Sequence, residues 1–452
     1  MDTINLKKVG VGIPEILLPS DSIDMHKWSV VACDQYTSQP EYWSEVEQII
    51  DGEPSTFNLI LPEIYLEVQD RQERINKINE NMEKYLEGGI LVPLSPGFIY
   101  TDRKTTRTPS RKGLIMCVDL EKYDYSKGSQ SLIRATEGTV IDRLPPRVRI
   151  RQDAIIELPH IMILIDDPEK TVLEPLAEKL DNMVKLYDFD LMMKGGHIKG
   201  YKIDDKKMIS GIVCALEKLA DPNSFRERYK VDEDKGVLLF AVGDGNHSLA
   251  SAKVHWENIK KTLHIDESYN HPARYALVEI VNVHDEGISF EPIHRVLFNV
   301  NPDKVLGHML DYYKKHSNCE LFFFDNNRAL HAKLAELSKN KGLQTIPFIT
   351  KNKLGIVSIL NPVFNIEAGT LQDFLDNFLE ENPSVKIDYI HGENVVASLG
   401  SKEGNIGFFL PPMDKCDLFK TVILDGALPR KTFSMGEAEE KRFYLECRKI
   451  IK

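Results

Sequence analysis

Residues 243–248 combine side chains that could bind an anion, a metal ion or a proton. They read Gly-Asp-Gly-Asn-His-Ser, so Asp244 offers oxygen ligands and His247 offers a ring that titrates near neutral pH. The apolar run 237–242 before them is typical of a buried strand, and helix-forming residues follow. A helix N-terminus here would present unpaired N–H groups and partial positive charge, which suits an anion.

The alternative interpretation of this turn is structural. Gly243 and Gly245 would then only permit the chain to turn, and Asn246 would cap the helix. Polar turns between a strand and a helix are common, so the residue types leave both interpretations open.

A second acidic residue lies where a strand is expected to end. Residues 28–33 predict a short strand, and the following Asp34 and Gln35 come just before a capping box that opens a helix at residues 38–41. Carboxylates in this position are often functional, although Asp34 could instead form a local turn with its own backbone.

Three arginines near the middle of the chain have alternate spacing. Arg147, Arg149 and Arg151 flank Val148 and Ile150, so in an extended chain all three guanidinium groups would share one face. The planar fork of arginine suits phosphate oxygens, and such a cluster stands out in an acidic protein. The alternative is an ordinary ion-paired surface.

Two further basic loops could hold a phosphate. Arg430, Lys431 and Thr432 follow a proline near the C-terminus. Residues 194–200 are rich in glycine and lysine but do not match a Walker A loop, so they are a weaker candidate.

Length and composition limit the number of domains and the class of protein to which these motifs belong. A chain of 452 residues with 42% hydrophobic and 28% charged residues predicts a globular protein of two domains, with the boundary near residue 270. Neither a transmembrane run nor a signal core is present, so we expect a cytoplasmic protein with reduced cysteines. The formal net charge of −12 argues against general nucleic-acid or anionic-membrane binding.

Three short motifs together resemble the free-serine kinases of the ParB/sulfiredoxin-like superfamily and their larger relatives. They are Cys33-Asp34-Gln35, residues 243–247, and Pro429-Arg430-Lys431-Thr432. The resemblance implies an α/β (mixed α+β) fold with a ParB/sulfiredoxin-like catalytic core over residues 1–270. A second α/β domain over residues 271–452 would contribute to the active-site cleft.

The resemblance also implies roles for single residues. In that family an acidic residue followed by glutamine, just before the first helix, takes the proton from the serine hydroxyl. Asp34 and Gln35 occupy that place, with Asp where the archaeal kinases have Glu. The catalytic candidates are therefore Asp34, Gln35, Asp244 and His247.

The central turn departs from the family pattern D-G-H-H-R. Asn246 and Ser248 replace the first His and the Arg, which removes one phosphate contact that the arginine face could replace. The candidates for substrate or phosphate binding are Arg134, Thr136, Arg143, Arg147, Arg149, Arg151, Gly243, Gly245, Asn246, Ser248, Arg430, Lys431 and Thr432.

The activity implied is phosphorylation of free L-serine to O-phospho-L-serine. We expect pyrophosphate as donor, or else ADP or ATP, because the sequence has neither a P-loop nor a kinase glycine loop. Mg²⁺ is expected to bridge the donor phosphates, with Asp244 as its protein ligand. The partners would be small molecules, with no nucleic acid and no membrane, and the oligomeric state is left open.

Two other classes of function compete with this one. A ParB-like nucleotide-binding or regulatory module without kinase activity would need a basic recognition surface, which the acidic composition disfavours. A sulfiredoxin-like reductase would need a cysteine of low pKa in the phosphate turn, and residues 243–248 contain none.

Overall fold

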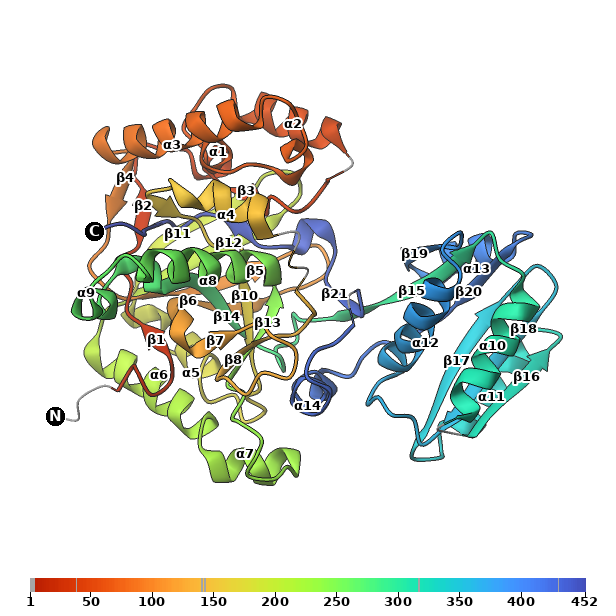
Figure 1. Cartoon of the computed structure of the whole chain (residues 1–452). Coiled ribbons are helices and arrows are strands. Elements are labelled where there is room, and N and C mark those ends of the chain that lie inside the picture. Colours follow the sequence, from red (N-terminus) through yellow and green to blue (C-terminus); the bar gives the residue numbers. More distant parts are fainter. Residues whose placement is uncertain (1–4, 38, 140, 142–143, 316–317, 430) are drawn as a thin grey trace. The chain divides into compact units, whose positions relative to one another are not determined.

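The computed structural model describes residues 5–37, 39–139, 141, 144–315, 318–429 and 431–452. They form two compact units, shown in Figure 1: unit 1 is Met1–Ser289 with Met435–Lys452, and unit 2 is Phe290–Ser434. Both units combine helices with mixed or antiparallel sheets, which confirms the expected α/β class.

The division differs from the boundary expected between residues 270 and 271. Strand β14 (Tyr275–Asn282) lies beyond that point, yet it pairs with β6 on one side and β10 on the other inside unit 1. Seven of its eight residues are buried, and an apolar strand of this kind is stable only inside a sheet that is covered on both faces.

The large sheet of unit 1 is mixed. Its strand order is β11-β12-β5-β6-β14-β10-β13-β8-β7, with β1 paired to β6. The strands are β1 (Val11–Gly12), β5 (Phe98–Lys104), β6 (Arg111–Asp119), β7 (Tyr123–Asp124), β8 (Ile133–Ala135), β10 (Met162–Ile165), β11 (Val184–Leu191), β12 (Gly196–Ile203) and β13 (Phe240–Asp244). Because β13 and β8 run parallel, their carboxyl ends meet at one edge of the sheet.

Alternate residues of β6 face two different cores. Ile115 and Cys117 pack in the cluster that includes α3 (Arg71–Glu87). Leu114 and Met116 pack in the other cluster, with α6 (Lys206–Leu219) and α8 (Asn246–Lys260). This is the period of two expected for a strand covered on both faces.

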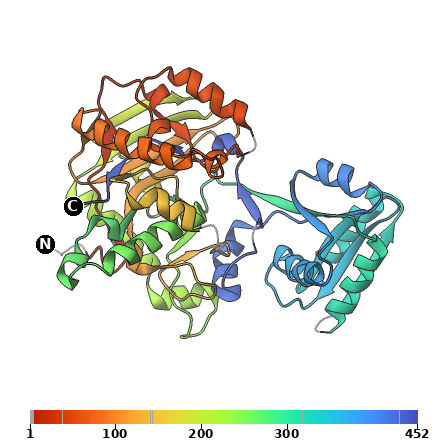
Figure 2. The ribbon, with the colours of Figure 1, turned by 45° about the horizontal axis from the view of Figure 1, so that its top comes forward.

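The C-terminal residues return to unit 1 and pair with segments from far earlier in the chain. Strand β22 (Phe443–Tyr444) pairs with β3 (Val30–Val31), and β23 (Arg448–Lys449) pairs with β9 (Ile156–Glu157). Figure 2 shows this blue segment beside the red N-terminal elements. The strand predicted over residues 28–33 is therefore only β3, because α1 (Met25–Trp28) precedes it.

Unit 2 has an antiparallel sheet in the order β16-β18-β17-β20-β15-β19, with β21 paired to β15. Its strands are β15 (Phe290–Phe298), β16 (Asn318–Phe324), β17 (Leu343–Ile349), β18 (Leu354–Leu360), β19 (Lys386–His391), β20 (Asn405–Phe408) and β21 (Phe433–Met435). Its helices are α10 (Pro302–Lys314), α11 (Asn327–Leu337), α12 (Glu367–Glu381), α13 (Glu393–Gly400) and α14 (Lys415–Asp425).

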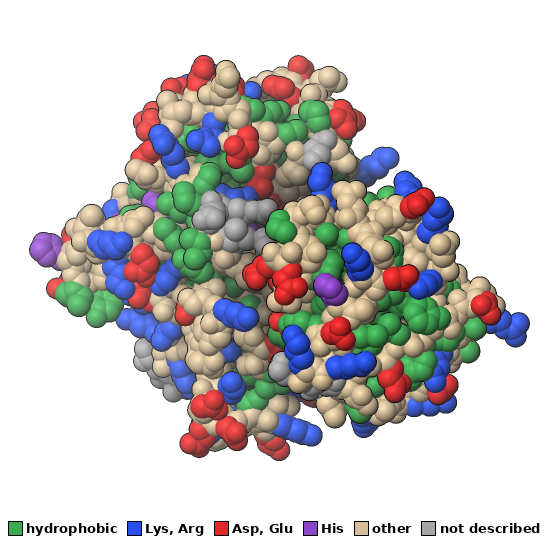
Figure 3. Space-filling view, turned by 45° about the vertical axis from the view of Figure 1, so that its right-hand side comes forward, with side chains coloured by type: hydrophobic (Ala, Val, Ile, Leu, Met, Phe, Trp, Pro, Cys, Tyr) green, Lys and Arg blue, Asp and Glu red, His purple; other side chains and the backbone are tan. Residues whose placement is uncertain are grey.

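The remaining helices of unit 1 are short, apart from α2 (Pro40–Ile50). They are α4 (Leu144–Gln152), α5 (Glu174–Ala177), α7 (Pro222–Tyr229) and α9 (Ile265–Tyr269). Within the described ranges, no helix combines the length and the apolar character needed to cross a membrane. Figure 3 shows acidic and basic side chains interspersed over the face it presents.

Candidate active site

Asp34 lies in the turn that follows β3, where it is partly buried. Gln35 Nε2 donates a hydrogen bond of 3.0 Å to Asp34 Oδ1. Burial by itself raises the pKa of Asp34, but the electrostatic influence of His160, the Gln35 hydrogen bond and the charge of Lys441 together lower it below the usual value. Asp34 is therefore an ionised carboxylate at neutral pH.

The backbone of this turn is unusual for its residue types. Tyr36 has a φ of 51°, in the left-handed region that bulky side chains rarely adopt. Its ring stacks on Tyr42 of α2 with the ring centroids 3.6 Å apart, and this stacking offsets part of the strain. Strained turns of this kind occur preferentially at functional sites.

His160 connects the turn to the start of α8. It lies between β9 and β10 with only 7% of its surface exposed. Its Nε2 is 2.8 Å from Ser248 Oγ, and its Nδ1 is 2.8 Å from the hydroxyl of Tyr444. The Tyr444 oxygen also accepts a hydrogen bond of 3.3 Å from the Cys33 main chain.

Asp244 is the last residue of β13, directly before the turn into α8. Asp244 Oδ1 accepts a hydrogen bond of 3.1 Å from the Gly245 main chain, and its Oδ2 is 3.2 Å from Nζ of Lys441. Gly245 has a φ of 78°, and a Cβ there would lie 3.0 Å from the Ile161 backbone. A Cβ on Gly243 would lie 2.9 Å from the Leu164 side chain. Packing therefore favours glycine at both positions, independently of any binding role.

Asn246 and Thr136 tie this turn to the end of β8. The Thr136 main chain donates to Asn246 Oδ1 at 3.3 Å, and both side chains donate to the carbonyl of Val242, at 2.6 Å from Thr136 and 3.3 Å from Asn246. Gly245 stands at the N-cap position itself, so the predicted side-chain cap by Asn246 is wrong, and Asn246 instead joins two strand ends. His247 lies partly buried in the first turn of α8, and its catalytic role stays a prediction.

The arginine face expected around residue 149 does not exist. Residues 144–152 form helix α4, so positions two apart point in different directions. Arg147 pairs with Glu63, Arg151 pairs with Glu157, and the exposed Arg149 donates to Gln72 at 3.1 Å. The two prolines that suggested an extended chain lie in the first turn of the helix, where proline is tolerated.

Arg134 points its guanidinium at main-chain groups. It is 1% exposed, and it donates to the carbonyls of Ser131, at 2.8 Å, and of Gly236. Burial lowers its pKa to about 10. These contacts hold the chain that leads into β13, and a role in phosphate binding stays a prediction.

The remaining candidates lie elsewhere. Arg143 and Arg430 fall outside the described residues. Lys431 is exposed and Thr432 is buried, with Thr432 Oγ1 donating to the carbonyl of Pro429 at 2.7 Å, and both belong to unit 2. Their part in phosphate binding stays a prediction.

A small cavity is lined by Cys33, the residue before Asp34. It has a volume of about 150 Å³, and its lining includes Cys33, His160, Ser248 and Tyr444. Cavities of about this volume accept molecules the size of benzene. Burial, the largest cause, raises the pKa of the Cys33 thiol far above its usual range, so Cys33 is not a reactive thiolate.

The site fits Mg²⁺ only in a limited sense. No group of three or more His, Cys, Asp or Glu side chains that could hold a metal occurs in the part of the chain that the structure describes. Mg²⁺ bound to a phosphate donor commonly uses one or two protein carboxylates, and Asp244 can supply one. The ammonium of Lys441 would have to leave that carboxylate first.

Three site residues were missed from the sequence: His160, Tyr444 and Lys441. His160 is an isolated histidine in an apolar stretch, and Lys441 stands in the run Glu-Glu-Lys-Arg, which is typical of a solvated surface. No pattern of spacing could link them to residues 34 and 244.

Comparisons with known proteins place the chain in a family. Among solved structures, a conserved hypothetical protein from Pyrococcus furiosus is 12% identical, with a TM-score of 0.36 over 75% of this chain and 95% of that one. A free serine kinase in complex with AMP is 10% identical, with a TM-score of 0.36 over 75% of this chain and 91% of that one. Likenesses this distant do not bear on function, and no curated protein matches. The family model described as "Protein of unknown function (DUF1015)" matches residues 17–378, and the chain therefore belongs to the DUF1015 family.

Proposed function

We propose that this protein is a phosphotransferase that phosphorylates free L-serine to O-phospho-L-serine, with Asp34 as the general base. The observation that carries the proposal is the state of Asp34. It is a partly buried carboxylate kept ionised by His160, Gln35 and Lys441, and the neighbouring Cys33 lines a cavity large enough for a small molecule.

The low pKa of Asp34 suits this chemistry. Phosphoryl transfer passes through a loose transition state in which the attacking hydroxyl keeps its proton until late, so an ionised carboxylate is a sufficient base. The serine oxygen forms a bond to the terminal phosphorus of the donor, the bond from phosphorus to the leaving phosphate oxygen breaks, and Asp34 takes the hydroxyl proton. The rest of the site contributes positioning and positive charge.

The donor is proposed to be pyrophosphate, with ADP or ATP as the alternatives. The motifs at residues 33–35 and 243–247 support a phosphate donor through their resemblance to free-serine kinases. When bound, Mg²⁺ would neutralise charge on the donor phosphates, and Asp244 would hold it. His247 and Ser248 lie at the start of α8, where main-chain N–H groups favour an anion.

The test is direct. The purified protein is incubated with L-serine and Mg²⁺ and, in separate samples, with pyrophosphate, ADP or ATP, and phosphorus NMR then detects phosphoserine. We expect product with at least one donor, and less with L-threonine. Absence of product with all three donors would refute the kinase, and nucleotide binding without turnover would favour the regulatory module.

A further inference from the structure

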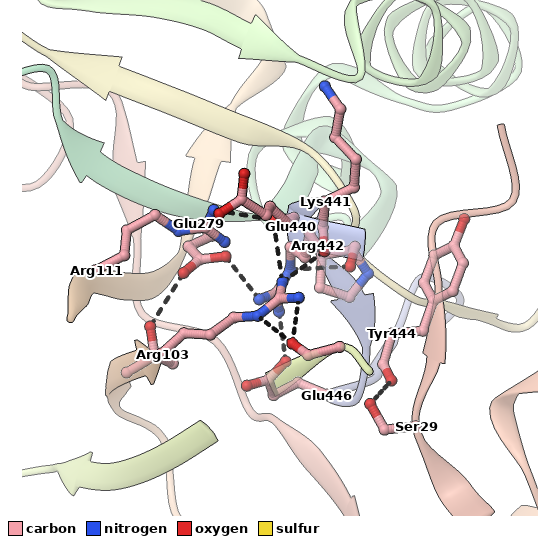
Figure 4. Close-up of polar contacts among 12 residues, drawn as sticks. Ser29, Arg103, Arg111, Glu279, Glu440, Lys441, Arg442, Tyr444 and Glu446 are labelled. Atoms are coloured by element: carbon pink, nitrogen blue, oxygen red, sulfur yellow. Dashed lines mark hydrogen bonds and ion pairs between the residues drawn. The ribbon is translucent and has the colours of Figure 1, made fainter. Parts of the chain in front are cut away.

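Buried arginines hold the main chain on both sides of Lys441. Arg103 of β5 is 2% exposed, and its guanidinium donates to the carbonyls of Glu439, at 2.7 Å, and of Lys441. Arg111 of β6 is 6% exposed and donates to the carbonyl of Glu440 at 3.0 Å. Figure 4 shows the two arginines converging on this segment.

The next residue, Arg442, is itself an anchor. Its Nε donates to the carbonyl of Pro159 at 3.1 Å, and its two terminal nitrogens donate to Glu279, at 2.8 Å, and to Glu446. All three charged side chains are at most 3% exposed. Burying a charged group costs several kcal/mol per ion unless the group is paired. Such a network therefore contributes little net stability, and its main effect is to fix the position of this part of the chain.

The side chain held in this way is that of Lys441. Figure 4 shows it pointing away from the arginine cluster. Its Nζ lies 3.2 Å from Asp244 Oδ2, only 12% of the side chain is exposed, and its charge also acts on Asp34. One ammonium group thus pairs with Asp244 and acts electrostatically on Asp34, although it comes from the C-terminal end of the chain.

The turn at residues 243–248 has no cation of its own. It contains neither lysine nor arginine. Arg147 and Arg151 of α4 line the same cavity as Ser248, but each is paired with a glutamate there. A phosphate at the start of α8 would therefore need a cation from another segment. Lysine suits this role because its ammonium is a compact charge on a flexible stem, able to exchange a carboxylate for phosphate oxygens while its main chain stays fixed.

We propose that Lys441 is a catalytic residue of this site, which binds the donor phosphate and neutralises the phosphoryl group during transfer. The proposal rests on the proposed function in that it takes a phosphate donor as the ligand. Before the donor binds, Asp244 holds the ammonium in place. Once the phosphate takes over the ammonium, the carboxylate of Asp244 becomes available to the cation that accompanies the donor.

The first experiment measures donor binding without serine, so that it does not depend on the acceptor. Calorimetric titration with pyrophosphate and Mg²⁺ is run on the wild type and on Lys441→Ala, Lys441→Gln and Lys441→Arg. We expect the dissociation constant to rise about 10- to 100-fold for Ala and Gln, the usual effect of losing a charged hydrogen bond, and less for Arg. Lys449→Ala, an exposed lysine of the same segment, should bind like the wild type.

The second experiment separates catalysis from structure. In turnover, Lys441→Gln should lower kcat and raise the KM for the donor while the KM for serine stays the same. It should also move the acid limb of the pH profile to higher pH, because the Lys441 charge lowers the pKa of Asp34. A lysine that makes no contact with the donor would shift the acid limb in the same way but leave the donor affinity and the KM for the donor unchanged, which would overturn the proposal.

The outcomes distinguish this proposal from the proposed function. If pyrophosphate, ADP or ATP binds in a Lys441-dependent way but serine is not phosphorylated, serine is not the acceptor, and the role of Lys441 in binding the donor is supported. If serine is phosphorylated and all Lys441 variants bind and turn over the donor normally, the proposed kinase activity is supported and the catalytic role of Lys441 is refuted. If none of the three donors binds to the wild type, Lys441 has no phosphate ligand and the proposal is refuted.

Discussion

Replacing Asp34 by asparagine tests the general base with little change of shape. The amide oxygen can still accept the hydrogen bond that Gln35 donates at 3.0 Å, so the turn keeps its main internal contact. What disappears is the negative charge that His160 and Lys441 stabilise and the ability to accept a proton. Losing a general base typically lowers kcat about 10²–10⁴-fold, or about 2.7–5.5 kcal/mol in activation free energy.

The pH profile provides the second measurement. Because the pKa of Asp34 lies below its usual value of about 3.9, the wild type should keep its full kcat/KM from about pH 5 to neutrality and lose it only in stronger acid. Phosphorus NMR or a coupled assay for phosphoserine gives the rates, and thermal unfolding checks the fold. Asp21→Asn, at an exposed aspartate of the same segment, is the matched control and should behave like the wild type.

Two results would refute this reasoning. The first is a folded Asp34→Asn variant that retains kcat within a few-fold of the wild type. The second is a wild-type acid limb near neutral pH, because a carboxylate whose pKa is lowered does not take up a proton until the pH is far more acidic. Either result would remove Asp34 from proton transfer.

The remaining predictions concern the buried charges. Arg151→Ala should lower the free energy of unfolding by about 1–3 kcal/mol, because it removes a charged hydrogen bond to Glu157, and should leave the KM for the donor unchanged. Arg442→Met should cost about 3–5 kcal/mol, because Glu279 and Glu446 lose their shared cation. Burial, the largest single cause, raises the pKa of Glu279, but the charges of Arg442, Arg111 and Arg103 and the Thr101 hydrogen bond together lower it below its usual value. Stability should therefore be full above about pH 4.3 and fall as the pH decreases further. Urea unfolding at several pH values measures the stabilities, and the phosphoserine assay measures the KM for the donor.

Each of these has a contrary outcome. Arg149→Ala, at the exposed arginine of α4, is the control and should change stability by about 0.5 kcal/mol or less. A higher KM for the donor in Arg151→Ala, without loss of stability, would show that α4 takes part in binding the phosphate donor. Wild-type stability in Arg442→Met, or stability independent of pH down to about pH 3, would mean that the pairs contribute nothing net.

The sequence alone determined the local features of this protein. An apolar run bounded by a polar turn predicted β13, and the glycines around Asp244 predicted the turn before α8. It also placed Asp34 in a turn between a strand and a helix. These features depend on residues close together in the chain, so the periodicity of apolar residues and the residue types in turns are enough to predict them.

The prediction from the sequence was wrong for the arginines of α4. The pattern of Arg147, Val148, Arg149, Ile150 and Arg151 fits a strand, but the segment is a helix whose arginines pair with Glu63 and Glu157. Alternation over five residues is too short to separate the two periods, and packing against α8 decides between them.

Only the tertiary structure decided which residues surround Asp34. His160 and Lys441 come from segments that no local pattern connects to residue 34. Lys441 reads as a solvated surface lysine, and it reaches Asp244 because Arg103 and Arg442 hold its main chain inside unit 1. Burial, charge pairing and the return of the C-terminal strand to β3 are long-range effects, and these set the ionisation of Asp34 and complete the site.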